Sequence, residues 1–183
     1  MPNYRRWYTG RFVFLTVVTA ARQRLLCGEL ARRLLREAID EARQRWPWRT
    51  RAMVLPPDHL HVLWELPEDD LDYSKRVARW KGRFTSKWLA AGGAESDVPA
   101  GQRRRRLRGV WQQRFLKHTI RDPRDYRFHL DYIHSNPVKH KLVKRPVEWP
   151  WSSFHRYVRE GQYESDWAGR IDLPGSTEYT WIE

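Results

Sequence analysis

The sequence predicts an α+β fold, in which an antiparallel sheet packs against helices on one of its faces. The predicted elements follow the order strand, helix, strand, strand, helix, strand, and then a third helix. A short break at Pro56-Pro57 joins two β-rich segments, as in a hairpin of antiparallel strands. The two longer helices each have one apolar face, which a helix packed on a sheet requires.

Strands are predicted where β-branched and aromatic residues gather, and helices where apolar residues recur every three or four positions. The predicted strands are 11–19, 50–55, 59–66 and 111–120, and the predicted helices are 29–45 and 73–90. A third helix is expected to begin at Asp122-Pro123, because Asp caps helices and Pro suits the first turn. It is expected to end near Asn136-Pro137, since proline disfavours a helical residue before it.

The charge of the chain points to a nucleic-acid partner. Lys and Arg total 35 against 22 Asp and Glu, which gives a formal charge of +13. The helix 73–90 is cationic, and no acidic residue lies between Asp72 and Glu95. A helix of this kind can lie along a phosphate backbone, although a solvated face is the alternative. The expected DNA contacts on this helix are Lys75, Arg76, Arg79, Arg83 and Lys87.

A flexible basic insert is expected at about 91–110. It begins with a glycine-rich stretch and contains a block of four like charges. The block, which is a further expected DNA contact, consists of Arg103, Arg104, Arg105 and Arg106.

A cytoplasmic location is expected, with no membrane partner. Cys27 is the only cysteine, so neither an internal disulfide nor a cysteine zinc site is possible. The longest apolar run, 12–21, is too short to span a bilayer.

His59-Leu60-His61 lies within the third predicted strand. Side chains alternate along a strand, so the two histidines share one face and form half of a metal site. The alternative is a pair of strand histidines that face water or hydrogen-bond locally.

The third predicted helix carries a tyrosine away from its apolar stripe. At about 100° per residue, Tyr126, Leu130 and Ile133 gather on one side. Tyr132 and Asn136 lie one turn apart on another side. A tyrosine hydroxyl can attack a phosphodiester, and a divalent cation beside the phosphate assists it. Two imidazoles and an amide oxygen suit Mg²⁺ or Mn²⁺, of which Mn²⁺ is the better match to imidazole.

These motifs carry a resemblance to a known family. His59-Leu60-His61 is similar to the His-hydrophobic-His motif of HUH endonucleases, and residues 131–140 resemble the tyrosine helix of REP-associated tyrosine transposases. Further similar segments are 4–6, 111–115, 149–156 and 166–169. Lys141 departs from the family pattern, in which glycine commonly stands at this position.

The resemblance implies a ferredoxin-like catalytic domain at 1–145 and a DNA-binding or regulatory tail at 146–183. It implies cleavage and rejoining of single-stranded DNA at hairpins of repetitive extragenic palindromes by a nucleoid-associated monomer. Tyr132 would be the nucleophile, with His59, His61 and Asn136 as ligands of Mg²⁺ or Mn²⁺. Further expected DNA contacts are Tyr4, Arg5, Arg6, Arg114, Trp149 and Trp151.

Two other functions are consistent with the same residues. One is a hairpin-binding protein that keeps the fold without the chemistry. The other is a hydrolytic metal phosphodiesterase, which forms no covalent adduct with DNA.

Overall fold

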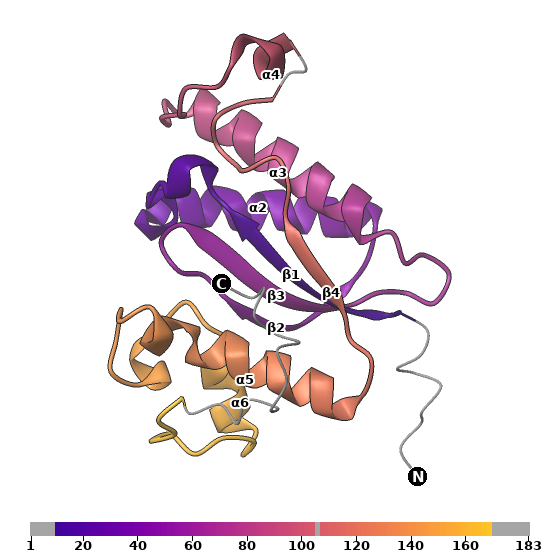
Figure 1. Cartoon of the computed structure of the whole chain (residues 1–183), viewed down its shortest axis with the longest axis vertical. Coiled ribbons are helices and arrows are strands. Elements are labelled where there is room, and N and C mark those ends of the chain that lie inside the picture. The colour runs from indigo at the N-terminus through magenta and orange to yellow at the C-terminus, as the bar shows by residue number, and fades with distance from the viewer. Residues whose placement is uncertain (1–9, 105–106, 170–183) are drawn as a thin grey trace.

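The sheet of this protein has four antiparallel strands in the order β2-β3-β1-β4. The computed structural model describes residues 10–104 and 107–169 (Figure 1). The strands are β1 (Phe12–Val18), β2 (Arg49–Val54), β3 (His59–Glu65) and β4 (Leu116–Thr119). The predicted α+β class and the predicted hairpin of β2 and β3 are confirmed.

Helices cover both faces of the sheet (Figure 1). The helices α2 (Glu29–Arg45) and α3 (Tyr73–Ala90) pack on one face, as predicted, against β1 and β3 side chains such as Leu15 and Trp64. The opposite face, which the sequence left open, is covered by α5 (Pro123–Lys139). All of β3 is therefore buried, although apolar residues alternate with histidines along it.

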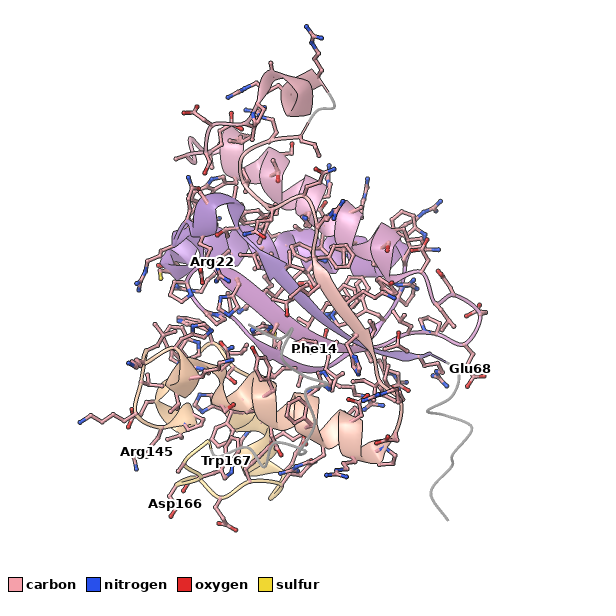
Figure 2. The ribbon with its side chains drawn as sticks, in the orientation of Figure 1. Phe14, Arg22, Glu68, Arg145, Asp166 and Trp167 are labelled. Atoms are coloured by element: carbon pink, nitrogen blue, oxygen red, sulfur yellow. The ribbon has the colours of Figure 1, made fainter. Side chains whose placement is uncertain are left out.

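Short helices connect and complete these layers. They are η1 (Ala20–Arg22), η2 (Leu25–Cys27), α4 (Ala100–Arg104), η3 (Pro146–Glu148) and α6 (Phe154–Arg159). The segment after α5 adds Phe154, Tyr157 and Tyr163 to the apolar core beneath α5. Trp167 lies on that outer side and stacks on Phe154 with ring centroids 5.7 Å apart (Figure 2). Within the described residues, no helix is both long and apolar enough to cross a membrane.

The fourth strand is shorter than predicted. β4 begins at Leu116, which pairs with Thr16, rather than at residue 111. Trp111 forms only an isolated bridge, with Thr19, because the chain leaves the sheet edge between the two pairings. The intervening residues turn toward a cavity described below.

The start of α5 is as predicted, but its end is not. Asp122 accepts a hydrogen bond from the backbone N–H of Asp125 at 2.8 Å, as a capping residue does. The helix then continues through Pro137 to Lys139, so the predicted end is wrong. Proline removes one backbone donor, whereas the next bond of the helix, from His140 N–H to the Asn136 carbonyl, forms at 3.0 Å.

Lys141 ends this helix in the left-handed conformation, with φ of +55°. Its N–H donates to the Val138 carbonyl at 2.9 Å. Glycine is the usual residue at such a position, because a Cβ is disfavoured there. Lys141, where the family commonly has glycine, therefore adopts a conformation that is strained for a residue with a Cβ.

We expect Lys141→Gly to raise the free energy of unfolding by up to about 1 kcal/mol. Relief of the left-handed strain exceeds the larger chain entropy of glycine in the unfolded state. Denaturant unfolding measures the difference. The control is Ala91→Gly at the end of α3, where φ is −86° and glycine relieves nothing, so that variant should be less stable than the parent. A loss of stability in Lys141→Gly would contradict the strain.

Candidate active site with a histidine pair and a tyrosine

A cavity of about 540 Å³ opens between the sheet and the C-terminal half of α5. We call it the histidine pocket. It brings together the histidine pair of β3 and the tyrosine of α5, which are 71 residues apart when counted from His61 to Tyr132. Its lining residues are Thr16, Val18, Arg22, His59, His61, Gln112, Arg114, Phe115, Leu116, Tyr132, Lys139 and His140.

The two histidines lie on the same face of β3, as predicted, and both are buried. Their ring centroids are 4.7 Å apart. Nδ1 of His59 lies 2.6 Å from a carboxylate oxygen of Asp58, and Nδ1 of His61 lies 2.8 Å from the hydroxyl of Thr16. When each Nδ1–H donates to its oxygen, each Nε2 keeps a lone pair for a metal. The histidines therefore do not face water, whereas the contact of His59 with the adjacent Asp58 is the local hydrogen bond that the same alternative allowed.

The charges around the pair favour metal-binding forms of the side chains. Burial lowers the pKa of His61 well below its usual value, and the neighbouring His59 and His140 lower it further. His61 is thus neutral near pH 7, as a ligand must be. Burial alone would raise the pKa of Asp58, but the hydrogen bond with His59 and the ion pair with Arg22 lower it to about 2. Asp58 is therefore ionised and orients the His59 ring.

Tyr132 is buried against the sheet, at 5% exposure, rather than displaced from the apolar part of α5. Its ring centroid lies 5.2 Å from that of His61 and 5.9 Å from that of Phe14. The prediction of a tyrosine off the core was wrong because α5 is enclosed on two sides, by the sheet and by the segment that contains Phe154. The result still places Tyr132 beside the histidine pair.

Asn136 lies one turn after Tyr132 and is completely buried. Neither its amide nitrogen nor its amide oxygen has a hydrogen-bond partner in the part of the chain that the structure describes. Buried amides nearly always have partners, so an unmatched one fits a missing ligand. Two imidazoles and one amide oxygen are ligand types that suit a divalent cation, and the buried Asn136 amide lies outside the lining of the histidine pocket.

Several residues of the pocket were missed by sequence reasoning. Asp58 directly precedes His59, and this adjacency was the one signal that the sequence offered. Thr16 reaches His61 only through the register of β1 with β3. His140, whose ring centroid lies 5.0 Å from that of His59, reaches the pocket because α5 extends past Pro137.

A second histidine cluster lies outside the pocket. Nε2 of His118 is 2.7 Å from one carboxylate oxygen of Asp125, and Nδ1 of His129 is 3.1 Å from the other. These three residues could also hold a metal ion. Phe14 lies between the two sites, with its ring centroid 4.8 Å from that of His129 and 5.5 Å from that of His61 (Figure 2). Tyr132 lines the histidine pocket, which makes the pocket the candidate site of chemistry.

The cationic helix α3 is largely neutralised by tertiary contacts. Lys75 is paired with Asp70, and Lys87 with Glu37 at 2.9 Å. Arg83 is paired with Glu41 of α2 at 2.6 Å. The sequence showed no acidic residue within α3, but Asp70 precedes the helix, and α2, which packs beside it, supplies Glu37 and Glu41. Arg79 is exposed and has no ion pair among the residues that are described.

The expectation that Arg76 contacts DNA is wrong. Its side chain is completely buried and donates to the backbone oxygens of Pro47 and Asp72 at 3.0 Å and 2.8 Å. It also lies 3.1 Å from the carboxylate of Asp70. Arg76 thus holds the start of α3 in place.

The remaining predicted DNA contacts fall in different places. Arg114 lines the histidine pocket, and Trp151 is exposed. Trp149 is partly buried and donates its indole N–H to the Leu55 carbonyl at 3.3 Å. Arg103 lies 3.8 Å from Glu95, and Arg104 is exposed. Outside the described residues lie Tyr4, Arg5, Arg6, Arg105 and Arg106.

Comparison with known proteins assigns the family. Residues 11–136 match the family model described as transposase IS200 like. A REP-associated tyrosine transposase of Escherichia coli K12 is 39% identical over 173 residues, which cover 93% of each chain. The solved structure of a REP-associated tyrosine transposase bound to a REP hairpin is similar with a TM-score of 0.73, 39% identity and 96% coverage of each chain.

The fold and the pocket define a DNA endonuclease and strand transferase of the single-tyrosine HUH class. The chain belongs to the IS200-like transposase family, which confirms the family that the sequence motifs indicated. Metal dependence is general in this class.

We expect Arg76→Ala to lower the free energy of unfolding by about 3 kcal/mol, because it leaves the backbone oxygens of Pro47 and Asp72 without their buried donor. Arg79→Ala, the matched exposed change on the same helix, should alter stability by less than about 0.5 kcal/mol. Denaturant unfolding distinguishes the two variants. Equal stability of the two would contradict a structural role of Arg76.

We expect Asp58→Asn to weaken Mn²⁺ binding by about 10- to 100-fold, because an amide fixes the orientation of the His59 ring less well than a carboxylate. Isothermal titration calorimetry measures the affinity. Asp69→Asn, at an exposed carboxylate before α3, is the control and should bind Mn²⁺ as the parent does. Unchanged affinity in Asp58→Asn would show that Asp58 does not act on the metal site.

Proposed function

We propose that this protein nicks and rejoins single-stranded DNA at palindromic hairpins through a covalent bond between Tyr132 and the 5′ phosphate. The observation that carries this function is the position of Tyr132, whose ring lies 5.2 Å from His61 within one cavity. The solved relative bound to a REP hairpin supports repetitive extragenic palindromes as the substrate class.

The metal of this reaction would be held by His59, His61 and Asn136. Imidazole ligands favour Mn²⁺, and Mg²⁺ is the alternative with the same charge. When bound, the cation offsets phosphate charge and polarises the phosphoryl oxygen. The buried and unmatched amide of Asn136 supports this ligand set.

The side chains of the pocket are suited to a phosphodiester. Arg22, Arg114 and Lys139 line the cavity and supply positive charge for the phosphate oxygens. Nζ of Lys139 lies 5.2 Å from the centroid of the Tyr132 ring, so cation and nucleophile share one end of the pocket. These contacts would hold the scissile phosphate in reach of the Tyr132 hydroxyl.

The chemical step exchanges one phosphate ester for another. The Tyr132 oxygen loses its proton and forms a bond to phosphorus, while the bond from phosphorus to the 3′ oxygen breaks. The 3′ oxygen takes up a proton and leaves as a free hydroxyl. Since no water is consumed, a second 3′ hydroxyl can reverse the step and rejoin the DNA.

The proposal includes a monomer as the active unit, as the resemblance to the family implies. The same activity supports a cytoplasmic, nucleoid-associated location. The segment 146–183 would act with the catalytic domain as a DNA-binding or regulatory tail.

We expect Tyr132→Phe to abolish cleavage, because it removes the nucleophilic oxygen and little volume. Hairpin cleavage in Mn²⁺ and mass spectrometry of the trapped protein–DNA adduct measure this. Tyr126→Phe, on the same helix, is the control and should still form the adduct. An adduct on Tyr126 would move the nucleophile, and efficient cutting without any adduct would support the hydrolytic alternative.

We expect His59→Ala and His61→Ala each to lower cleavage at least about 100-fold, while hairpin affinity stays within a few-fold of the parent. The fold is maintained by the core on both sides of β3, which the remaining side chains still fill, whereas the metal needs both imidazoles. Cleavage and fluorescence anisotropy are measured on the same preparations. Normal nicking in the double variant would show that the metal site is elsewhere, and intact binding without cleavage in the parent would indicate a silent binding protein.

A further inference from the structure

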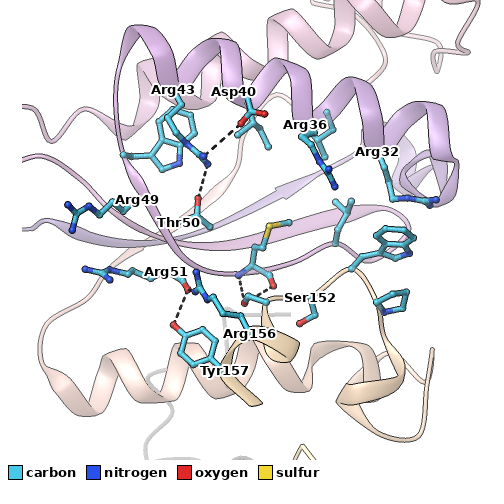
Figure 3. A pocket seen from close by; sticks show the side chains of 18 of the residues that line it. Arg32, Arg36, Asp40, Arg43, Arg49, Thr50, Arg51, Ser152, Arg156 and Tyr157 are labelled. Atoms are coloured by element: carbon cyan, nitrogen blue, oxygen red, sulfur yellow. Dashed lines mark hydrogen bonds and ion pairs between the residues drawn. The ribbon is translucent and has the colours of Figure 1, made fainter. Parts of the chain in front are cut away.

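A larger cavity, of about 950 Å³, lies on the opposite edge of the sheet from β4 (Figure 3). It follows the edge strand β2, with α2 on one side and residues 150–162 on the other. We call it the β2 groove. None of the residues of the histidine pocket lines it, so it is a separate feature of the surface.

The β2 groove is cationic, and its charge comes from three separate parts of the chain. Its arginines are Arg32, Arg36 and Arg43 from α2, Arg49 and Arg51 from β2, and Arg156 from α6. Only two acidic residues, Asp40 and Glu160, line the groove with them. This excess fits a polyanion.

The arginines of the groove are tied to the protein to different degrees. Arg51 is paired with the buried Glu65, and Arg43 donates to the hydroxyl of Thr50 at 3.4 Å, so both have structural roles. By contrast, Arg36 and Arg49 are exposed and have no hydrogen bond or ion pair among the described residues. Two cations are thus available to a ligand without the loss of an internal contact.

One end of the groove offers a stacking surface. Trp151 is 37% exposed, and the guanidinium carbon of Arg32 lies 3.9 Å from the centroid of its ring. The backbone beneath the ring is fixed, because the carbonyl of Trp151 accepts a hydrogen bond from Leu55 N–H at 2.8 Å. An exposed aromatic ring with an arginine on one face suits stacking of a nucleic-acid base.

This end of the groove is close to the catalytic strand. Val54, the last residue of β2, pairs with His61 in the sheet. Neighbouring strands are about 4.8 Å apart, so Leu55 lies one strand spacing from the histidine strand, and Trp151, which pairs on the outer side of β2, lies about two spacings away. A DNA strand that leaves the histidine pocket at this end of the sheet can therefore continue into the β2 groove.

We infer that the β2 groove binds the unpaired DNA strand next to the hairpin. Arg36 and Arg49 contact its phosphates, and a base stacks at Trp151. An unpaired strand fits better than a duplex, because stacking on Trp151 needs a free base face, which paired bases in a stem do not offer. The inference rests on the proposed function, since it names a second part of the same substrate.

The test uses Tyr132→Phe as the parent, so that binding is measured without cleavage. The probe is a fluorescent DNA hairpin with single-stranded flanks, copied from palindromes of the host genome. We expect Arg36→Gln/Arg49→Gln to bind this probe about tenfold more weakly at physiological salt. The slope of log affinity against log salt should fall by about 1.4, since each phosphate contact to a single strand contributes about 0.7.

The matched control is Arg33→Gln/Arg45→Gln, which removes two exposed arginines of the same helix that do not line the groove. The slope of log affinity against log salt should fall in this control by less than half as much as in the groove variant. A hairpin without flanks should bind equally to the groove variant and to the parent, and Trp151→Ala should weaken binding only when the flank carries bases rather than abasic sites.

Two results would overturn the assignment of the unpaired strand to this groove. One is an equal loss of affinity in the groove variant and the control. The other is a loss of affinity in the groove variant that is as large for the hairpin without flanks as for the flanked probe. Either result leaves the adduct on Tyr132 unaffected. If the protein with Tyr132 intact forms no adduct while the groove variant still binds DNA more weakly, the proposed chemistry alone is rejected. Failure of the Tyr132→Phe parent to bind any hairpin probe would reject both.

Discussion

The structure depends on the register of β3 between β1 and β2, under helices on both faces. The pairing of Thr16 with His61 places a hydroxyl at Nδ1 of one histidine, and the residue before β3 places the Asp58 carboxylate at Nδ1 of the other. A shift by one residue would turn both histidines toward α2 and α3. The apolar residues that alternate with the histidines prevent this shift, because they fill the core on that face.

The same constraint explains why the tyrosine is buried. α5 must cover an apolar sheet face that includes Phe14 and Leu63, so its sheet-facing side is also the side that meets His61. One helix face thus serves both burial and the proposed chemistry. The continuation of α5 past Pro137 then extends this face to Lys139 and His140, which complete the wall of the pocket.

Charge is distributed differently in space and in sequence. The helix with the densest run of cations, α3, is balanced by Glu37 and Glu41 of its neighbour α2. The β2 groove collects arginines from α2, β2 and α6, which are separate segments of the sequence. The net charge of +13 therefore indicates the class of partner correctly but not the surface that receives it.

Most elements of the fold, the histidine pair on one strand face, and the family could be predicted from the sequence, because periodicity and short motifs depend on residues close together in the chain. α2 and α3 agree with the predicted ranges residue for residue. The burial of Tyr132, the internal position of Arg76, and the contacts of Asp58 and Thr16 with the histidines could not be predicted in this way. Those outcomes depend on contacts between distant segments, and no local pattern records which carboxylate or which sheet face will meet a given side chain.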